Sequence, residues 1–167
     1  MDENLKKEDE KPPKNRELDR TDRDILNILS QNARTKLTQI SKKIGLSVDS
    51  IKKRIMKLER SGIITKYTIQ VNTGIIGLPL GVHIYVKFKN FNQSRFEEFI
   101  KYLRASPRVI DLMSMAGDYD LYIVILAAGT EDIEKKKNEI RQNFSDIIGD
   151  WKEVLVTRLH KLEEYKF

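Results

Sequence analysis

The spacing of apolar positions changes once along the chain. From residue 18 to residue 67, aliphatic residues recur every three or four positions, which is typical of amphipathic helices. Beyond residue 79, several segments alternate apolar and polar residues, which is typical of strands with one exposed face. Between the two patterns, residues 68–79 contain two glycines and a proline. The chain is therefore predicted to fold as two modules joined by a hinge at 68–79.

The helical half is predicted to contain three short helices. Asp19 is placed to cap the first helix, and Thr38 to cap the second. Gly45 ends the second helix in the left-handed conformation, and Ser47 caps the third. Two helices joined by a short Gly-Leu-Ser connection are typical of a helix-turn-helix. The alternating segment IITKYTIQVN, which follows Gly62, is predicted to add the β-ribbon of a winged domain.

The third predicted helix, SVDSIKKRIMKLERSG, has a narrow apolar stripe and a basic opposite face. The stripe consists of Val48, Ile51, Ile55 and Leu58. Ser50, Lys53, Lys57 and Arg60 gather roughly opposite, with Lys52 and Arg54 on the flanks. Solvated charged helices usually alternate Glu and Lys for mutual support, but Glu59 is the only acid after Asp49. We therefore interpret the segment as a helix that enters the major groove of DNA.

The charge distribution supports this interpretation. Residues 18–67 carry twelve Lys and Arg against five Asp and Glu, whereas residues 68–167 carry fourteen of each. The basic excess of the chain thus lies in the helical half, where it would attract a polyanion. The candidate DNA-binding residues are Thr38, Ser47, Val48, Asp49, Ser50, Lys52, Lys53, Arg54, Lys57 and Arg60.

These candidates are expected to play different roles. Residues from Val48 to Lys53 would approach base edges, and Lys57 and Arg60 would meet phosphates. Arg54 lies nearer the apolar stripe, so that two roles remain open for it: a phosphate contact or a bond within the domain.

The second half is predicted to follow the order β-α-β-β-α-β. The segments are LGVHIYVKFKN, NQSRFEEFIKYLRAS, RVIDLMSMA, LYIVILA, TEDIEKKKNEIRQNF and WKEVLVTRL. This order is that of a ferredoxin-like domain. The expected fold class is α+β, with a helix-turn-helix domain at 18–67 and a ferredoxin-like domain at 80–167.

The first half also resembles the DNA-binding domain of the Lrp/AsnC ("feast/famine") transcription regulators. The matching positions are Leu18-Asp19, Asp22, Ile25-Leu26, Leu29, Ala33-Arg34, Gly45-Leu46-Ser47, Arg54-Ile55, Leu58-Glu59, Gly62-Ile63-Ile64 and Tyr67. The second half is similar to the family's RAM domain, which carries a Gly-x-Tyr-Asp turn between its second and third strands. Here that turn is Gly117-Asp118-Tyr119-Asp120.

The resemblance implies properties that spacing alone does not. It implies a sequence-specific regulator that binds double-stranded promoter DNA. It also implies a homodimer formed through RAM sheets, higher homo-oligomers, and an amino-acid effector at the turn. Gly117, Asp118, Tyr119 and Asp120 are then the effector-site candidates. A plain β-turn with Tyr119 as a packing residue is the alternative.

The remaining features narrow the expected function. Residues 1–17 are almost devoid of apolar residues and are expected to form a disordered tail. The chain lacks cysteine, has only His83 and His160 as histidines, and has no nucleophile elbow or Gly-rich phosphate loop. We expect a cytoplasmic protein that is not an enzyme and has no cofactor, metal or membrane partner. The alternatives are an architectural DNA-compacting protein without an effector and a regulatory subunit of a metabolic enzyme.

Overall fold

The computed structural model describes residues 17–162 and 165–167, and these form two compact units. Apart from Glu17, the tail expected at 1–17 lies outside the described residues. The first unit comprises the described residues up to Gln70 together with those from Lys161 onward. The second unit is Val71–His160. Within the first unit, the Asn27 side chain donates to the Phe167 carbonyl at 3.1 Å and accepts from the Phe167 backbone N–H at 2.9 Å. No described helix is long and apolar enough to cross a membrane.

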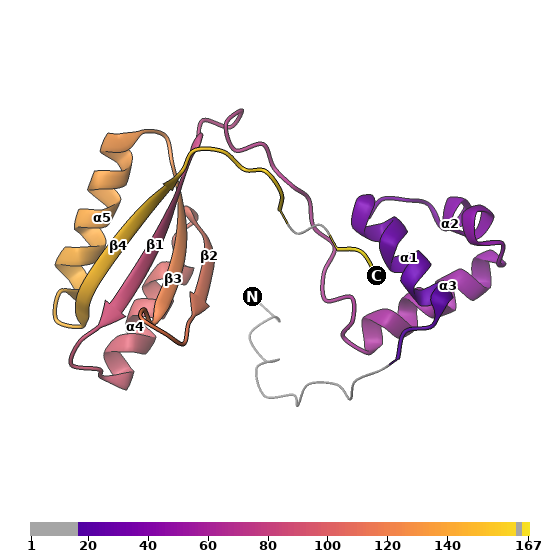
Figure 1. Ribbon diagram of the computed structural model, residues 1–167, viewed down its shortest axis with the longest axis horizontal. Helices are drawn as coiled ribbons and strands as arrows, with labels where there is room; N and C mark the ends of the chain where they lie inside the picture. The colour runs from indigo at the N-terminus through magenta and orange to yellow at the C-terminus, as the bar shows by residue number, and fades with distance from the viewer. Residues whose placement is uncertain (1–16, 163–164) are drawn as a thin grey trace. The chain divides into compact units, whose positions relative to one another are not determined.

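Three helices make up the first unit: α1 Arg20–Gln31, α2 Leu37–Ile44 and α3 Val48–Arg60 (Figure 1). Two of the three predicted caps are present. The Asp19 carboxylate accepts a hydrogen bond from the backbone N–H of Asp22 at 2.8 Å, and the Ser47 hydroxyl accepts one from Ser50 at 3.2 Å. These bonds satisfy backbone donors that the first turn of a helix cannot use internally.

The prediction that Thr38 caps α2 is wrong. The helix begins one residue earlier, at Leu37, and Lys36 is the capping residue. The backbone N–H of Lys36 donates to the Gln39 side chain at 3.2 Å. A glutamine three residues after the cap can reach back in this way, so a hydroxyl at the cap is not needed.

The core of the first unit contains the inward residues of all three helices. The buried members are Ile25, Leu26, Ile40, Ile51, Ile55 and Leu58. The predicted stripe of α3 is thus confirmed at three of its four positions. Val48, at the first turn of α3, is 37% exposed and lies outside the core.

The β-ribbon predicted for residues 63–72 does not form within the described chain. Residues 65–72 have no strand pairing, and Ile69 is 77% exposed. A strand needs a neighbour to satisfy its backbone groups, and none of the described residues pairs with this segment as a strand.

The second unit has the predicted β-α-β-β-α-β order. Its elements are β1 Leu80–Phe88, α4 Gln93–Arg104, β2 Val109–Ser114, β3 Leu121–Ala127, α5 Thr130–Phe144 and β4 Ile148–Val156. The sheet order is β2-β3-β1-β4, and every neighbouring pair is antiparallel. This is the ferredoxin-like arrangement expected from the sequence.

Alternation along the strands gives the sheet two unlike faces. Val82, Ile84 and Val86 of β1 pack with Phe99 of α4 and Ile140 of α5, so both helices cover one face. The residues between them point to the opposite face, which neither α4 nor α5 covers. We call this the open face.

Candidate nucleic-acid interface and effector turn

The outer surface of α3 carries the cations predicted to contact DNA. Lys52, Lys53, Lys57 and Arg60 are all exposed, and none of them forms an ion pair within the described residues. They line an open hollow together with Asp49 and Met56. Because the opposite side of the helix is anchored in the core, these side chains are presented to solvent as one surface.

The start of α3 is polar, but its hydroxyls are engaged. Ser47 donates from its hydroxyl to that of Ser50 at 2.9 Å, in addition to capping the helix. Val48 and Asp49 are exposed beside them. Thr38, exposed in the first turn of α2, is the only candidate in the DNA-binding set that comes from another helix.

Arg54 forms two ion pairs inside the domain. Its Nη1 lies 2.6 Å from Asp19 Oδ2 and 2.8 Å from Asp22 Oδ1. The Asp22 side chain is only 2% exposed. A hydrogen bond from the Asp22 backbone, and then the Arg54 guanidinium, lower the pKa of Asp19. The sequence left open whether Arg54 contacts phosphate or bonds within its own domain. In the structure it bonds within the domain.

Tyr67 is a contact of α3 that the sequence pattern did not reveal. Its hydroxyl donates to Glu59 Oε1 at 2.8 Å. Burial, followed by this bond to a carboxylate, raises the pKa of Tyr67 to about 12. The bond ties the segment after α3 to the helix and engages the only acid in its second half.

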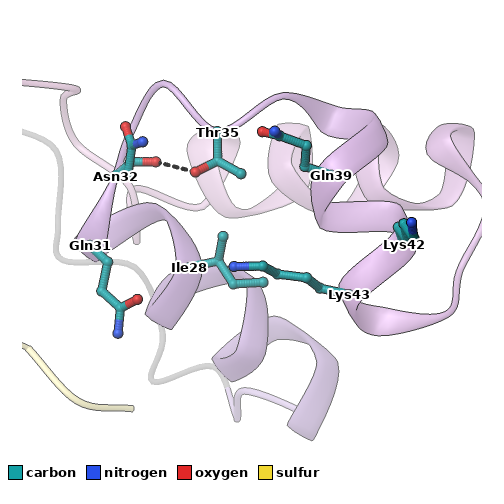
Figure 2. A pocket seen from close by; sticks show the side chains of 7 residues that line it. All are labelled: Ile28, Gln31, Asn32, Thr35, Gln39, Lys42 and Lys43. Carbon is teal, nitrogen blue, oxygen red and sulfur yellow. Dashed lines mark hydrogen bonds between the residues drawn. The ribbon is translucent and has the colours of Figure 1, made fainter.

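A second polar hollow lies between the end of α1 and α2 (Figure 2). Its lining residues are Ile28, Gln31, Asn32, Thr35, Gln39, Lys42 and Lys43. The Thr35 hydroxyl donates to the Asn32 carbonyl at 2.7 Å and shapes the connection between the helices. In Figure 2 the Lys43 side chain extends toward Ile28. This surface was not among the predicted DNA-binding residues, because only the fold brings α1 and α2 together here.

The structure brings the four residues of the predicted effector turn to one end of the sheet. Gly117 has a φ of +144°, and a Cβ placed on it would have no neighbour within 4 Å. A glycine is therefore needed here for its φ rather than for lack of space, and open space lies above it. Asp118 is exposed, whereas Tyr119 is half-buried and its hydroxyl lies 3.4 Å from Asp150 Oδ2. Burial, then the charge of Asp150, raise the pKa of Tyr119.

Asp120 holds the turn against β1. Its Oδ2 accepts the backbone N–H of Phe88 at 2.8 Å, and its Oδ1 lies 3.0 Å from Lys87 Nζ. The first of these bonds is the main reason why the pKa of Asp120 is lowered, with Lys87 adding to the effect. A carboxylate that was predicted only to contact an effector therefore also has a structural role.

An aromatic row crosses the open face from β1 to the turn. The His83 and Tyr122 ring centroids are 5.4 Å apart, and Tyr122 hydrogen-bonds His83 Nδ1 at 2.6 Å. Tyr85 continues the row, with its ring centroid 5.3 Å from that of Tyr122 and 5.8 Å from that of Tyr119.

No group of three or more His, Cys, Asp or Glu in the described part of the chain could hold a metal ion.

Both halves of the chain match known family models. Residues 18–65 match a winged helix-turn-helix DNA-binding domain, and residues 82–147 match the Lrp/AsnC ligand binding domain. A transcriptional regulator called FL11 from Pyrococcus horikoshii is 31% identical over 132 residues, which cover 79% of this chain and 80% of that protein. The regulator LysM from Saccharolobus solfataricus is 33% identical over 135 residues, covering 81% and 91%.

Solved structures of the same architecture support the match. Escherichia coli AsnC has a TM-score of 0.78 at 24% identity, with 90% of this chain and 99% of that chain covered. A regulator from Neisseria meningitidis, solved as its L-Met complex, has a TM-score of 0.80 at 22% identity, with coverage of 87% and 94%. At these identities the likeness establishes the fold. The relatives are transcription regulators, not enzymes, and the chain belongs to the Lrp/AsnC family of DNA-binding transcription regulators.

Proposed function

We propose that α3 is the recognition helix and that it reads specific promoter DNA in the major groove. The observation that carries the proposal is the exposed row of Lys52, Lys53, Lys57 and Arg60, which no described acid neutralises. Four cations without acidic partners on one helix face attract the phosphates of DNA, whereas a solvated helix usually pairs its cations with acids one turn away. The ion pairs of Arg54 and the buried aliphatic stripe fix the opposite side of the helix to the rest of the domain.

The roles within this face follow from position along the helix. Lys53 lies in the first half of α3, where side chains reach base edges when a recognition helix enters the groove by its N-terminal end. Lys57 and Arg60 lie in the last turn and would meet phosphates. Thr38 would add a hydrogen bond to the backbone of the DNA. The Ser50 hydroxyl, which accepts from Ser47, would donate to a base edge.

Two alanine variants test this assignment. Lys53→Ala should weaken binding and relax the preference at one base position. Lys57→Ala should weaken binding to all sequences and lower the slope of log K against log salt by about one unit. The measurement is fluorescence anisotropy on a selected site and on random duplex between low and moderate salt. Lys135→Ala, on α5 of the other unit, is the matched control because it removes the same charge elsewhere.

An equal loss on both duplexes for both variants would rule out base reading. That result would favour the architectural alternative, in which the protein compacts DNA through charge alone.

We further propose that the second unit assembles the protein into homodimers and higher oligomers through its open face. The aromatic row of His83, Tyr85, Tyr119 and Tyr122 supports this, because these rings are only half-buried and aromatic residues are enriched at the centres of protein interfaces. A dimer would place two α3 helices on one duplex, as paired half-sites require. A cytoplasmic location is proposed with this function, since the DNA lies there.

An amino-acid effector is proposed for the turn Gly117–Asp120. The match to a ligand binding domain and the L-Met complex of the Neisseria regulator support an effector of this class. Asp118 is exposed beside the open space above Gly117, where it can pair with an ammonium group. Calorimetry of the intact protein with all twenty amino acids tests the proposal. If none of the twenty amino acids gives a heat of binding, the turn is not an amino-acid site, and assembly is the role that remains for the second unit.

A further inference from the structure

An apolar side chain lies in the middle of the cationic face of α3. Met56 is 38% exposed. It lines the open hollow of α3 together with Asp49, Lys52, Lys53, Lys57 and Arg60. Among the described large apolar side chains of α1, α2 and α3, only Val48 and Met56 are exposed, and both belong to α3. Packing in the core explains the other apolar residues of these helices, but it does not explain Met56.

Asp49 indicates which part of this face suits the floor of a groove. At about 100° per residue, Asp49 and Met56 lie within about 20° of each other, on a line between Lys52 on one flank and Lys57 on the other. Asp49 is exposed and forms no ion pair with another described residue. Phosphates repel a carboxylate, so the line on which Asp49 lies fits the floor of the major groove better than its walls. Met56, about two turns further along this line, then faces base edges when α3 enters the groove.

The major groove offers one apolar group to such a side chain, the C5-methyl of thymine. A methionine side chain is unbranched and polarisable, so it adjusts to a methyl group whose position depends on the docking angle of the helix. Contact between the two removes apolar surface of both from water. Adenine, guanine and cytosine have no methyl group at this position, so the gain is specific to thymine.

We propose that Met56 is a specificity-determining residue that contacts the methyl group of a thymine in the promoter site. The contact favours thymine over the other three bases at one position of the site that α3 reads. No charge is involved, so the contact adds sequence preference without adding salt dependence. The inference rests on the proposed reading of DNA by α3, and it adds a residue that is absent from the predicted DNA-binding set.

Deoxyuridine tests this contact because it differs from thymidine only by the missing methyl group. A preferred duplex is first selected from random DNA with the full-length protein. Each thymine of that duplex is then replaced in turn by deoxyuridine, and the affinities are measured by fluorescence anisotropy. The parent protein should lose about fourfold in affinity at one of these thymines, which is the contribution of one buried methyl group.

Variants identify the residue that contacts the methyl group. Met56→Ala should bind the thymine and deoxyuridine duplexes equally at that position, and Met56→Leu should keep part of the difference because it keeps an apolar side chain. Lys53→Ala is the matched control on the same face, since it weakens binding but should keep the response to the missing methyl group. The slope of log K against log salt should be unchanged in Met56→Ala and reduced in Lys57→Ala. Circular dichroism checks that each variant is folded.

The outcomes separate this inference from the proposed function. A preferred site without thymine would overturn the inference, as would a parent protein that is insensitive to every replacement. The same holds if Met56→Ala keeps the full loss at the same thymine, because another residue would then contact the methyl group. In these cases the reading of DNA by α3 stands if Lys53→Ala relaxes the base preference. If the parent protein binds selected and random duplexes equally, both proposals fail.

Discussion

Neighbouring cations of α3 play different parts because of where their side chains can reach. Lys53 and Arg54 are adjacent in sequence, yet Lys53 is exposed and Arg54 is bonded to Asp19 and Asp22 of the first helix. The pairing joins α3 to the N-terminus of α1, where the helix dipole also favours the two carboxylates. Arg54 therefore contributes to the stability of the domain that presents the other cations.

Removing the Arg54 guanidinium should destabilise the first unit. We expect Arg54→Ala to lower the free energy of unfolding by about 2 kcal/mol, because Asp22 is buried and loses this charged partner. Urea denaturation followed by circular dichroism measures the change. Lys53→Ala, on the exposed face, should change it by less than about 0.5 kcal/mol. A variant as stable as the parent that binds DNA poorly would assign Arg54 to phosphate contact instead.

At the scale of elements, the connection between α2 and α3 sets the angle of the helix-turn-helix. Gly45 has a φ of +81°, and its N–H bonds the Ser41 carbonyl at 2.8 Å. The Ser41 hydroxyl donates to the carbonyl of Leu46, and Ser47 then caps α3. These three bonds engage backbone groups that the ends of the two helices cannot pair internally.

Gly45→Ala should destabilise the first unit through the backbone alone. A Cβ at this position would meet no atom within 4 Å, so the cost is that of a left-handed alanine, about 1–2 kcal/mol. Gly45→Asn fills the same open space but tolerates the left-handed region, and should lose markedly less. Denaturant midpoints of the three proteins provide the comparison. Equal losses for both substitutions would show that the side chain, rather than φ, determines the effect.

At the scale of the whole molecule, the chain combines a basic unit with a second unit of balanced charge. Residues 18–67 have a net charge of +7, whereas residues 68–167 have none. The positive charge of the first unit attracts a polyanion. Because the second unit has no net charge, two copies of it do not repel each other through net charge. The charge distribution thus fits the proposal that DNA binding and assembly belong to different units of one chain.

Tyr85→Glu should convert the protein to monomers. The residue lies in the centre of the aromatic row on β1, so a carboxylate there would be buried against another copy of itself in a dimer. Light scattering after size-exclusion chromatography measures the mass, and DNA affinity should fall with it because paired half-sites are lost. Lys101→Glu, on the exposed side of α4, is the control and should remain oligomeric. A Tyr85→Glu protein of unchanged mass would rule out the open face as the interface.

The sequence by itself determined the order of the helices and strands, the folds of the two domains and the basic face of α3. Helical and alternating periodicities report which side of each element is buried, and caps such as Asp19 and Ser47 act within three residues. The predicted ribbon at 63–72 was wrong because these signals are local. The segment does alternate, but a strand also needs a partner strand, which periodicity does not supply.

Only the tertiary structure decided which polar groups are engaged with one another. Arg54 meets Asp22 across 32 positions of sequence, and Asp120 meets Lys87 and Phe88 across 33 and 32. A hollow around Phe91 likewise exists only once β1, α4, β2 and the turn are brought together. The sequence shows that these residues are charged or apolar, but contacts between distant positions depend on how the elements pack, so the roles of Arg54 and Asp120 emerged only from the fold.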